Sequence, residues 1–283
     1  MEGRSQYSGK LSIIEAEMSR ASVPATHQVD EFGFDPEYAD RLLKPALWAY
    51  RNYWRVEAEG VRNVPAAGRA LLAANHSGVI PYDGAMIRTA IMAEHPHPRH
   101  ARMLVADWAF SIPFSSAVLL RTGNVLAHPE NATRLLERDQ LVGVFPEGVK
   151  GASKPFRDRY RVGRFGRGGF VELAIRTGSP IVPVAVVGGE EVHPVIADLP
   201  GLGRLIGMPT FPVTATFPWL GALGLLPLPS KWLISFLEPI ETAPFGSDAA
   251  EDNGLILELS DTVRQRVQRK VDQLRERRTT AFY

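Results

Sequence analysis

The stretch ALLAANHSGVIPYD, residues 70–83, combines a predicted strand with two chemically useful side chains. Its first part is small and apolar, and a short run of this kind that ends at turn-forming residues is typical of a buried β-strand. His76 follows the run closely, and Asp83 comes after a loop shaped by glycine and proline. An imidazole can take a proton from an attacking hydroxyl while a carboxylate on its other nitrogen fixes the tautomer. His76 and Asp83 are therefore a candidate catalytic dyad.

Further apolar runs alternate with helix-like segments on either side of this stretch. Strands that alternate with helices predict a mainly parallel sheet covered on both faces, with ligands beyond the carboxyl ends of the strands. We therefore expect a single α/β domain with a mainly parallel central sheet flanked by helices. The other strands are expected at 103–106, 141–145, 181–187 and 233–237, and helices at 84–94, 129–138 and 169–176.

The two ends of the chain differ from this central domain, which we place at 63–250. Residues 1–34 are polar and are predicted to form a loosely held arm. An amphipathic helical segment is expected at 35–62, and Pro45 should kink or divide its helix. Four aromatic residues of this segment suit either a bilayer interface or a helix docked on the core. An apolar stripe beside a basic face predicts a C-terminal helix, at 251–283, packed on the domain.

The composition excludes several classes of function. The 283 residues carry 32 Lys and Arg against 31 Asp and Glu, so the net charge of +1 gives no overall attraction to nucleic acid. Without cysteine the chain can form no thiolate nucleophile or thiolate metal site, and we expect no metal site. The N-terminal sequence lacks the continuous apolar core of a secretory signal. These features favour an intracellular protein.

Residues 205–230 form 26 consecutive positions without a charge, long enough for a membrane span. Five prolines interrupt the stretch, and a spanning helix would then lose backbone hydrogen bonds that lipid cannot replace. Two alternatives remain of equal weight. The stretch is either a buried connection packed on the sheet, or a surface that enters lipid or lines an acyl-chain tunnel.

A second stretch, VFPEGVKG at residues 144–151, again continues directly from a predicted strand. Glycines and a cation at the carboxyl end of a strand make a loop whose amides suit a phosphate or a developing oxyanion. A basic segment at 154–167 follows, with one lysine, five arginines and three aromatic residues. Its place after these strands favours an anionic ligand group over a merely solvated loop.

Together these motifs resemble those of the glycerolipid acyltransferases. His76 with Asp83 matches the first block of the family, the FPEG sequence at 145–148 matches a later block, and the apolar stretch 181–186 with its internal proline resembles a third. The order and spacing of three blocks are more specific than any one of them. The resemblance covers roughly residues 64–240, and its details are most similar to the branch of mono- and diacylglycerol acyltransferase-like proteins.

The resemblance implies an O-acyltransferase of phospholipid biosynthesis or related lipid metabolism. A fatty acyl group would pass from a thioester of coenzyme A or acyl carrier protein to a hydroxyl of a glycerolipid or related acceptor. His76 would be the general base and Asp83 its orienting carboxylate, with no cofactor beyond the thioester co-substrate. The substrate-binding residues that the resemblance implies are Asn75, Ser77, Phe145, Pro146, Glu147, Gly148, Lys150 and Arg157.

Three departures from the family pattern leave details open. Six residues separate His76 from Asp83 where the family commonly has four, so the loop must bulge, and Asp107 is an alternative partner. Val149 stands where many members carry threonine, and the family's glycine-aromatic run ending in arginine is matched only loosely at 120–124. Both a phosphorylated acceptor and a neutral alcohol therefore fit the sequence.

We expect a cytoplasmic protein, peripheral on the inner face of a membrane, which it contacts through residues 205–230 and the aromatic helix. Its partners would be an acyl thioester and a lipid acceptor, and not nucleic acid. Two other functions would use the same residues. One is hydrolysis of a thioester or ester by water that the dyad activates, and the other is lipid binding without catalysis, with His76 as a structural residue.

Overall fold

The computed structural model describes residues 29–282 except 79, 113 and 206. The predicted arm at 1–34 therefore lies outside the described residues apart from its last positions, and these are held in place. The Asp30 carboxylate pairs with Arg102 Nη1 at 2.6 Å, and the Arg102 guanidinium lies over the Phe34 ring at 4.8 Å. The end of the arm is thus fixed to a strand of the sheet.

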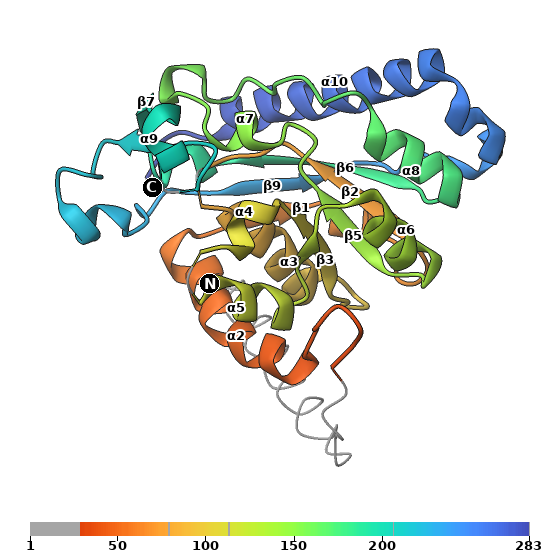
Figure 1. The fold of residues 1–283 in the computed structure, drawn as a ribbon, viewed down its shortest axis with the longest axis horizontal. Coiled ribbons are helices and arrows are strands. Elements are labelled where there is room, and N and C mark those ends of the chain that lie inside the picture. Colours follow the sequence, from red (N-terminus) through yellow and green to blue (C-terminus); the bar gives the residue numbers. More distant parts are fainter. Residues whose placement is uncertain (1–28, 79, 113, 206, 283) are drawn as a thin grey trace, which may run out of the picture.

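A seven-stranded sheet forms the centre of the molecule, in the order β1-β9-β6-β2-β5-β3-β4 (Figure 1). Neighbouring strands are parallel except β6 and β9, so the predicted α/β fold with a mainly parallel sheet is confirmed. The sequence did not predict β1, β4 or the separate two-stranded antiparallel sheet of β7 and β8. The strands are β1 Glu57–Glu59, β2 Ala70–Ala74, β3 Ala101–Val105, β4 Val125–Leu126, β5 Leu141–Val144, β6 Ile181–Val187, β7 Val195–Asp198, β8 Pro212–Thr214 and β9 Leu233–Phe236.

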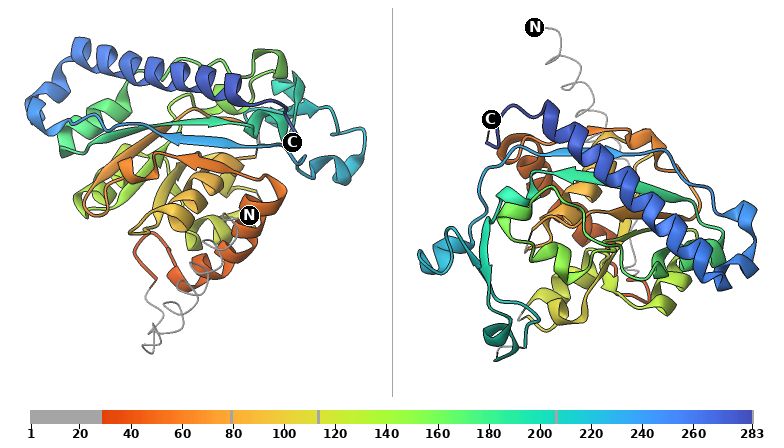
Figure 2. Two further views of the ribbon diagram at one scale, coloured as in Figure 1. Left: turned by 180° about the vertical axis from the view of Figure 1, so that it is seen from behind. Right: turned by 90° about the horizontal axis from the view of Figure 1, so that it is seen from above.

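Helices cover both faces of the sheet. Leu71 of β2 belongs to a core shared with α6, α8 and α10, and Leu72 belongs to a second core shared with α3. Figures 1 and 2 show α10 across one face of the sheet, with α2 and α3 on the other. Successive side chains of a strand point to opposite faces, which explains why β2 is buried throughout. The helices are α2 Pro36–Trp48, α3 Tyr82–Glu94, α4 Asp107–Phe110, α5 Ser115–Arg121, α6 Pro129–Glu137, α7 Val149–Ala152, α8 Gly169–Thr177, α9 Pro200–Leu205 and α10 Asn253–Arg277.

The predicted C-terminal helix is α10, and its valine stripe is buried in the core shared with α8. Several cations of its polar face pair with carboxylates of this chain. Lys270 and Arg277 both reach Glu59 at 2.6 Å, and Arg278, just beyond the helix, pairs with buried Glu191 at 2.8 Å. These contacts fix the end of the chain to the sheet.

Helix α2 continues through Pro45 and is followed by a π-helical turn at Ala49–Tyr53. Proline removes one backbone hydrogen bond, and here the packing of α2 against α3 keeps the helix undivided. The aromatic residues of the predicted segment 35–62 mainly dock on the protein. The Tyr53 hydroxyl donates to the Pro227 carbonyl at 2.5 Å, and Trp54 Nε1 donates to the Leu228 carbonyl at 3.1 Å.

The uncharged stretch at 205–230 projects beyond the sheet (Figures 1 and 2) and contains β8 and a short 3₁₀ turn at Gly221–Leu225. Its tip is exposed, with accessible fractions of 70% for Trp219 and 69% for Leu223. The alternative of a wholly buried connection is therefore wrong for the tip. Among the described residues, no helix has both the length and the apolar character needed to cross a bilayer.

Candidate active site

The loop after β2 brings His76 and Asp83 together. The distance between His76 Nδ1 and Asp83 Oδ2 is 2.6 Å, and the carboxylate is fully buried. Because an ionised carboxylate only accepts hydrogen bonds, Nδ1 carries the proton and Nε2 is the basic nitrogen. Nε2 has no hydrogen-bond partner among the described residues, and the ring is 14% exposed. The arrangement leaves one nitrogen free to accept a proton.

Three groups orient the Asp83 carboxylate despite the long loop. Besides His76, it accepts hydrogen bonds from the backbone N–H of Ser77 and of Gly84, each at 2.8 Å. Gly78 has φ +120, a conformation suited to glycine, and Asp83 reaches His76 although six residues separate the two. The alternative partner Asp107 is exposed and accepts from the N–H of Trp108 in its own helix.

Glu147 holds the backbone around His76 and is itself 2% exposed. Its carboxylate accepts hydrogen bonds from the N–H of His76 at 2.9 Å and of Gly163 at 2.6 Å. Lys154 Nζ lies 3.4 Å from the same carboxylate. Glu147 therefore acts here as a structural bridge between the His76 loop and the basic segment. Phe145, two positions earlier, stacks on the His76 ring with the centroids 4.4 Å apart.

The other predicted binding residues are spread over the site and its surroundings. Asn75 is buried and exchanges two hydrogen bonds with the backbone of Val186, which joins β2 to β6. Ser77 is buried beside Asp83, and Pro146 is half-buried. Gly148 lines the cavity described below, but its N–H is occupied by the Phe145 carbonyl at 2.9 Å.

The predicted cations Lys150 and Arg157 do not line that cavity. Lys150 is exposed on α7, and the Arg157 side chain is 85% exposed beside Asp158. The cation that the structure places near the dyad is Lys154, which is half-buried and pairs with Glu147 and, at 3.2 Å, with Glu190. The roles of Lys150 and Arg157 stay predictions.

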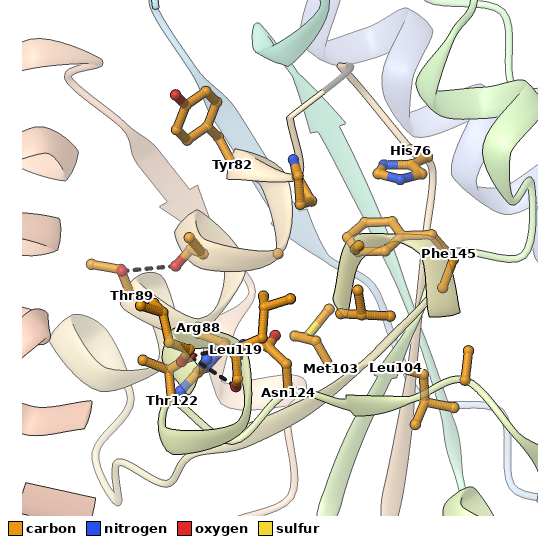
Figure 3. Close-up of a pocket in the computed structure, with 18 of the residues that line it drawn as sticks. His76, Tyr82, Arg88, Thr89, Met103, Leu104, Leu119, Thr122, Asn124 and Phe145 are labelled. Carbon is orange, nitrogen blue, oxygen red and sulfur yellow. Dashed lines mark hydrogen bonds between the residues drawn. The ribbon is translucent and has the colours of Figure 1, made fainter. Parts of the chain in front are cut away.

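A cavity of about 600 Å³ opens beside the dyad. His76 and Phe145 stand on one side, and most of the wall comes from α2, α3, β3, α4 and α5 (Figure 3). The lining is mainly apolar, as is usual for small-molecule sites of this size. The wall residues of α2 and Met103 escaped the sequence reasoning, because their apolar periodicity also fits an ordinary core.

A buried acid lies behind the dyad. Glu190, 7% exposed, accepts from the N–H of Tyr160 at 3.0 Å and pairs with Lys154. Burial raises the pKa of Glu190 to about 7, because loss of solvation outweighs the attraction of Lys154. The folded protein therefore binds this proton more tightly than the unfolded chain does.

This shift predicts that stability declines as the pH rises from about 4.5 to about 7, because the unfolded carboxyl ionises first. Replacing Glu190 by glutamine removes the titration. Between pH 4.5 and 7.5, the free energy of unfolding of the wild type should fall by roughly 2–3 kcal/mol relative to Glu190→Gln. Urea unfolding of both proteins across this range measures the difference, and parallel pH profiles would contradict it.

Comparisons with known proteins give a matching family model, related chains and a solved structure with a similar fold. A family model described as Acyltransferase matches residues 55–187. An uncharacterized protein of Mycobacterium tuberculosis is 45% identical over 93% of this chain and 74% of its own length, and one of Mycobacterium leprae is 44% identical over 93% and 72%. The crystal structure of the 1-acyl-sn-glycerophosphate acyltransferase PlsC from Thermotoga maritima is similar with a TM-score of 0.54 and 21% identity, covering 87% of this chain and 85% of that one.

Proposed function

Because this chain belongs to the acyltransferase family, we propose that it moves a fatty acyl group from a thioester to a hydroxyl of a glycerolipid or related lipid, with His76 as the general base. The observation that carries the proposal is the 2.6 Å contact between His76 Nδ1 and Asp83 Oδ2 beside a mainly apolar cavity of about 600 Å³. The cavity suits aliphatic chains, and the dyad suits proton transfer from an alcohol.

The transfer needs no covalent enzyme intermediate. His76 Nε2 takes the proton of the acceptor hydroxyl while its oxygen attacks the thioester carbonyl carbon. Asp83 stabilises the imidazolium that forms. The carbon–sulfur bond then breaks, and His76 returns the proton to the leaving thiolate, so the products are an ester and a free thiol. The donor would be a thioester of coenzyme A or acyl carrier protein.

Acceptor-dependent thiol release tests this function. The purified protein is incubated with a labelled acyl-coenzyme A and, in turn, glycerol 3-phosphate, lysophosphatidate, monoacylglycerol, diacylglycerol or a long-chain alcohol. Transfer is expected to give labelled ester and free thiol in equal amounts with at least one acceptor. Thiol release at the same rate without any acceptor would instead establish hydrolysis, and no release with any acceptor would favour lipid binding alone.

We also propose that the protein works at a membrane surface, with the tip at 216–226 as its main contact. Trp219, Leu220 and Leu223 are more exposed there than large apolar side chains usually are on a soluble surface. The Tyr53 and Trp54 hydrogen bonds to the carbonyls of Pro227 and Leu228 fix the base of the tip to the helical segment that contains exposed Trp48. This exposed apolar surface supports peripheral binding to a membrane, and we propose that the membrane face is the inner one.

The double substitution Trp219→Ser with Leu223→Ser is expected to weaken vesicle binding at least about tenfold, because each side chain loses roughly 1.5–3 kcal/mol of transfer free energy. Co-sedimentation with phosphatidylcholine–phosphatidylglycerol vesicles measures the bound fraction. Leu257→Ser is the matched control, since it removes a leucine that is 46% exposed on α10. Unchanged sedimentation of the double variant would count against this contact surface.

A further inference from the structure

One arginine of the cavity wall has no counter-charge among the residues that the structure describes. Arg88 belongs to α3, five positions after Asp83 and therefore about 7.5 Å farther along the helix axis. In Figure 3 it lies with Thr89, Thr122 and Asn124 on the side of the cavity away from His76. Among the described residues, its guanidinium makes no hydrogen bond or ion pair, although Arg88 is half-buried.

Two basic residues nearby differ from Arg88, because each has an acidic partner. Arg102 pairs with Asp30 at 2.6 Å, and His100, which also lines the cavity, is 3.3 Å from Asp40. Loss of solvation and the nearby Arg102 lower the pKa of Arg88 to about 10, so the group stays charged at neutral pH. A cation held in an apolar cavity without a partner is costly unless a ligand supplies the opposite charge.

The polar neighbours of Arg88 are already bonded within the protein. The hydroxyl of Thr89 donates to the Ala85 carbonyl, and that of Thr122 donates to the Val118 carbonyl. The Asn124 amide donates to Leu119 O and to Thr122 Oγ1. The N–H groups of Arg88 are therefore left to donate to a ligand, as is the indole N–H of Trp108, which also lines the cavity without a partner in the described part of the chain.

We propose that the side of the cavity away from His76 binds one anionic oxygen group, a carboxylate or a phosphate, through Arg88. The ligand carries this group on an aliphatic body that fills the apolar part of the cavity. The group belongs either to the lipid acceptor, as a phosphate, or to the acyl donor, as a carboxylate at the distal end of its chain. This proposal rests on the proposed function only for which substrate supplies the anion, because binding itself is measurable without turnover.

A matched pair of simple amphiphiles tests the binding. Octyl phosphate and octan-1-ol have the same octyl chain and differ in charge. Calorimetric titration gives the affinity of the protein for each. Replacing Arg88 by methionine should lower the affinity for octyl phosphate at least about tenfold, as expected for loss of a charge-assisted hydrogen bond. The affinity for octan-1-ol should change by less than about twofold. Arg88→Lys should be intermediate. The control Arg269→Met removes an exposed arginine from α10 and should leave both affinities unchanged.

The thermal midpoint of the ligand-free variants provides a second readout. Arg88→Met should unfold at the same or a higher temperature than the wild type, because it removes an unpaired cation from an apolar wall. A lower midpoint would show that Arg88 is bonded within the protein and would overturn the proposal. Octyl phosphate affinity that is unchanged in Arg88→Met, or that falls in parallel with the octan-1-ol affinity, would also overturn it.

Steady-state kinetics of acyl transfer identify which substrate supplies the anion, once transfer is established. With one acyl-coenzyme A, Arg88→Met should raise KM for lysophosphatidate and not for monoacylglycerol if the acceptor supplies the group. With one acceptor, it should raise KM for a donor with a terminal carboxylate and not for its methyl-terminated counterpart if the donor supplies it. Equal changes across both pairs would reject the site. Absence of any transfer rejects the proposed function, while the octyl phosphate result still decides the binding site.

Discussion

Replacing His76 by alanine is expected to lower acceptor-dependent acyl transfer by about 10²–10⁴-fold, the usual contribution of a positioned general base. The imidazole lines the cavity, Asp83 holds its Nδ1 at 2.6 Å, and Nε2 has no hydrogen-bond partner among the described residues. The loss should appear in kcat, because the ring supplies proton transfer more than lipid contact. Ester formation from labelled acyl-coenzyme A measures the rate.

Two measurements separate this loss from misfolding. His97→Ala removes an exposed imidazole from the turn after α3 and should retain full activity. The backbone N–H of His76 still donates to Glu147 in His76→Ala, so the variant should stay folded and keep its vesicle binding. Its stability should fall by about 1–3 kcal/mol, because buried Asp83 loses the hydrogen bond from Nδ1. A folded His76→Ala protein with undiminished turnover would falsify the assignment of the base and would favour a structural histidine.

Replacing Asp83 by asparagine is expected to cost about 10²–10⁴-fold in kcat, with KM nearly unchanged. An amide N–H facing Nδ1 favours the wrong tautomer, in which Nε2 carries the proton and cannot accept another. The buried carboxylate also accepts from Ser77 and Gly84. Asparagine can satisfy only part of this set, so we expect a loss of stability of about 1–3 kcal/mol as well.

Asp107→Asn is the matched control, because it changes the other acid that the sequence offered as a partner of His76. Asp107 is exposed and bonds its own helix, so this variant should keep wild-type kcat. Comparable kcat losses in Asp107→Asn and Asp83→Asn, or a loss in Asp107→Asn alone, would contradict the assigned dyad. Rates are compared at a temperature well below the lower of the two unfolding midpoints.

Strands β2, β3, β5, β6 and β9 and the position of the dyad were predictable because their signals are local. The run at 70–74 ends in the same place as β2, and His76 and Asp83 come from one loop. The antiparallel pairing of β9 with β6 was not predictable from local pattern, because it depends on which distant strands meet. The short edge strand β4, of two residues, carries too little periodicity to be recognised.

Side-chain partners were the least predictable part of the site. The basic residues after the FPEG stretch suggested a group of cations around an anion, yet Lys154 is paired with Glu147 and Glu190, and Arg157 lies in solvent. Nothing in the sequence marked Arg88 as a binding residue, since an isolated arginine in a helix is ordinary. Its position in the cavity depends on α2 and α5, which close the cavity from distant parts of the sequence.

The contacts of Glu147 bear on what a match to the FPEG stretch indicates about a protein. This carboxylate spans the N–H groups of His76 and Gly163 and pairs with Lys154, all within the protein. At this position the motif therefore helps to assemble the backbone around His76. A genome search with the motif would collect every chain able to build this loop, including chains whose histidine has been replaced. With His76 and Asp83 as the proposed dyad, counting such matches would overestimate the number of active enzymes unless both residues are required as well.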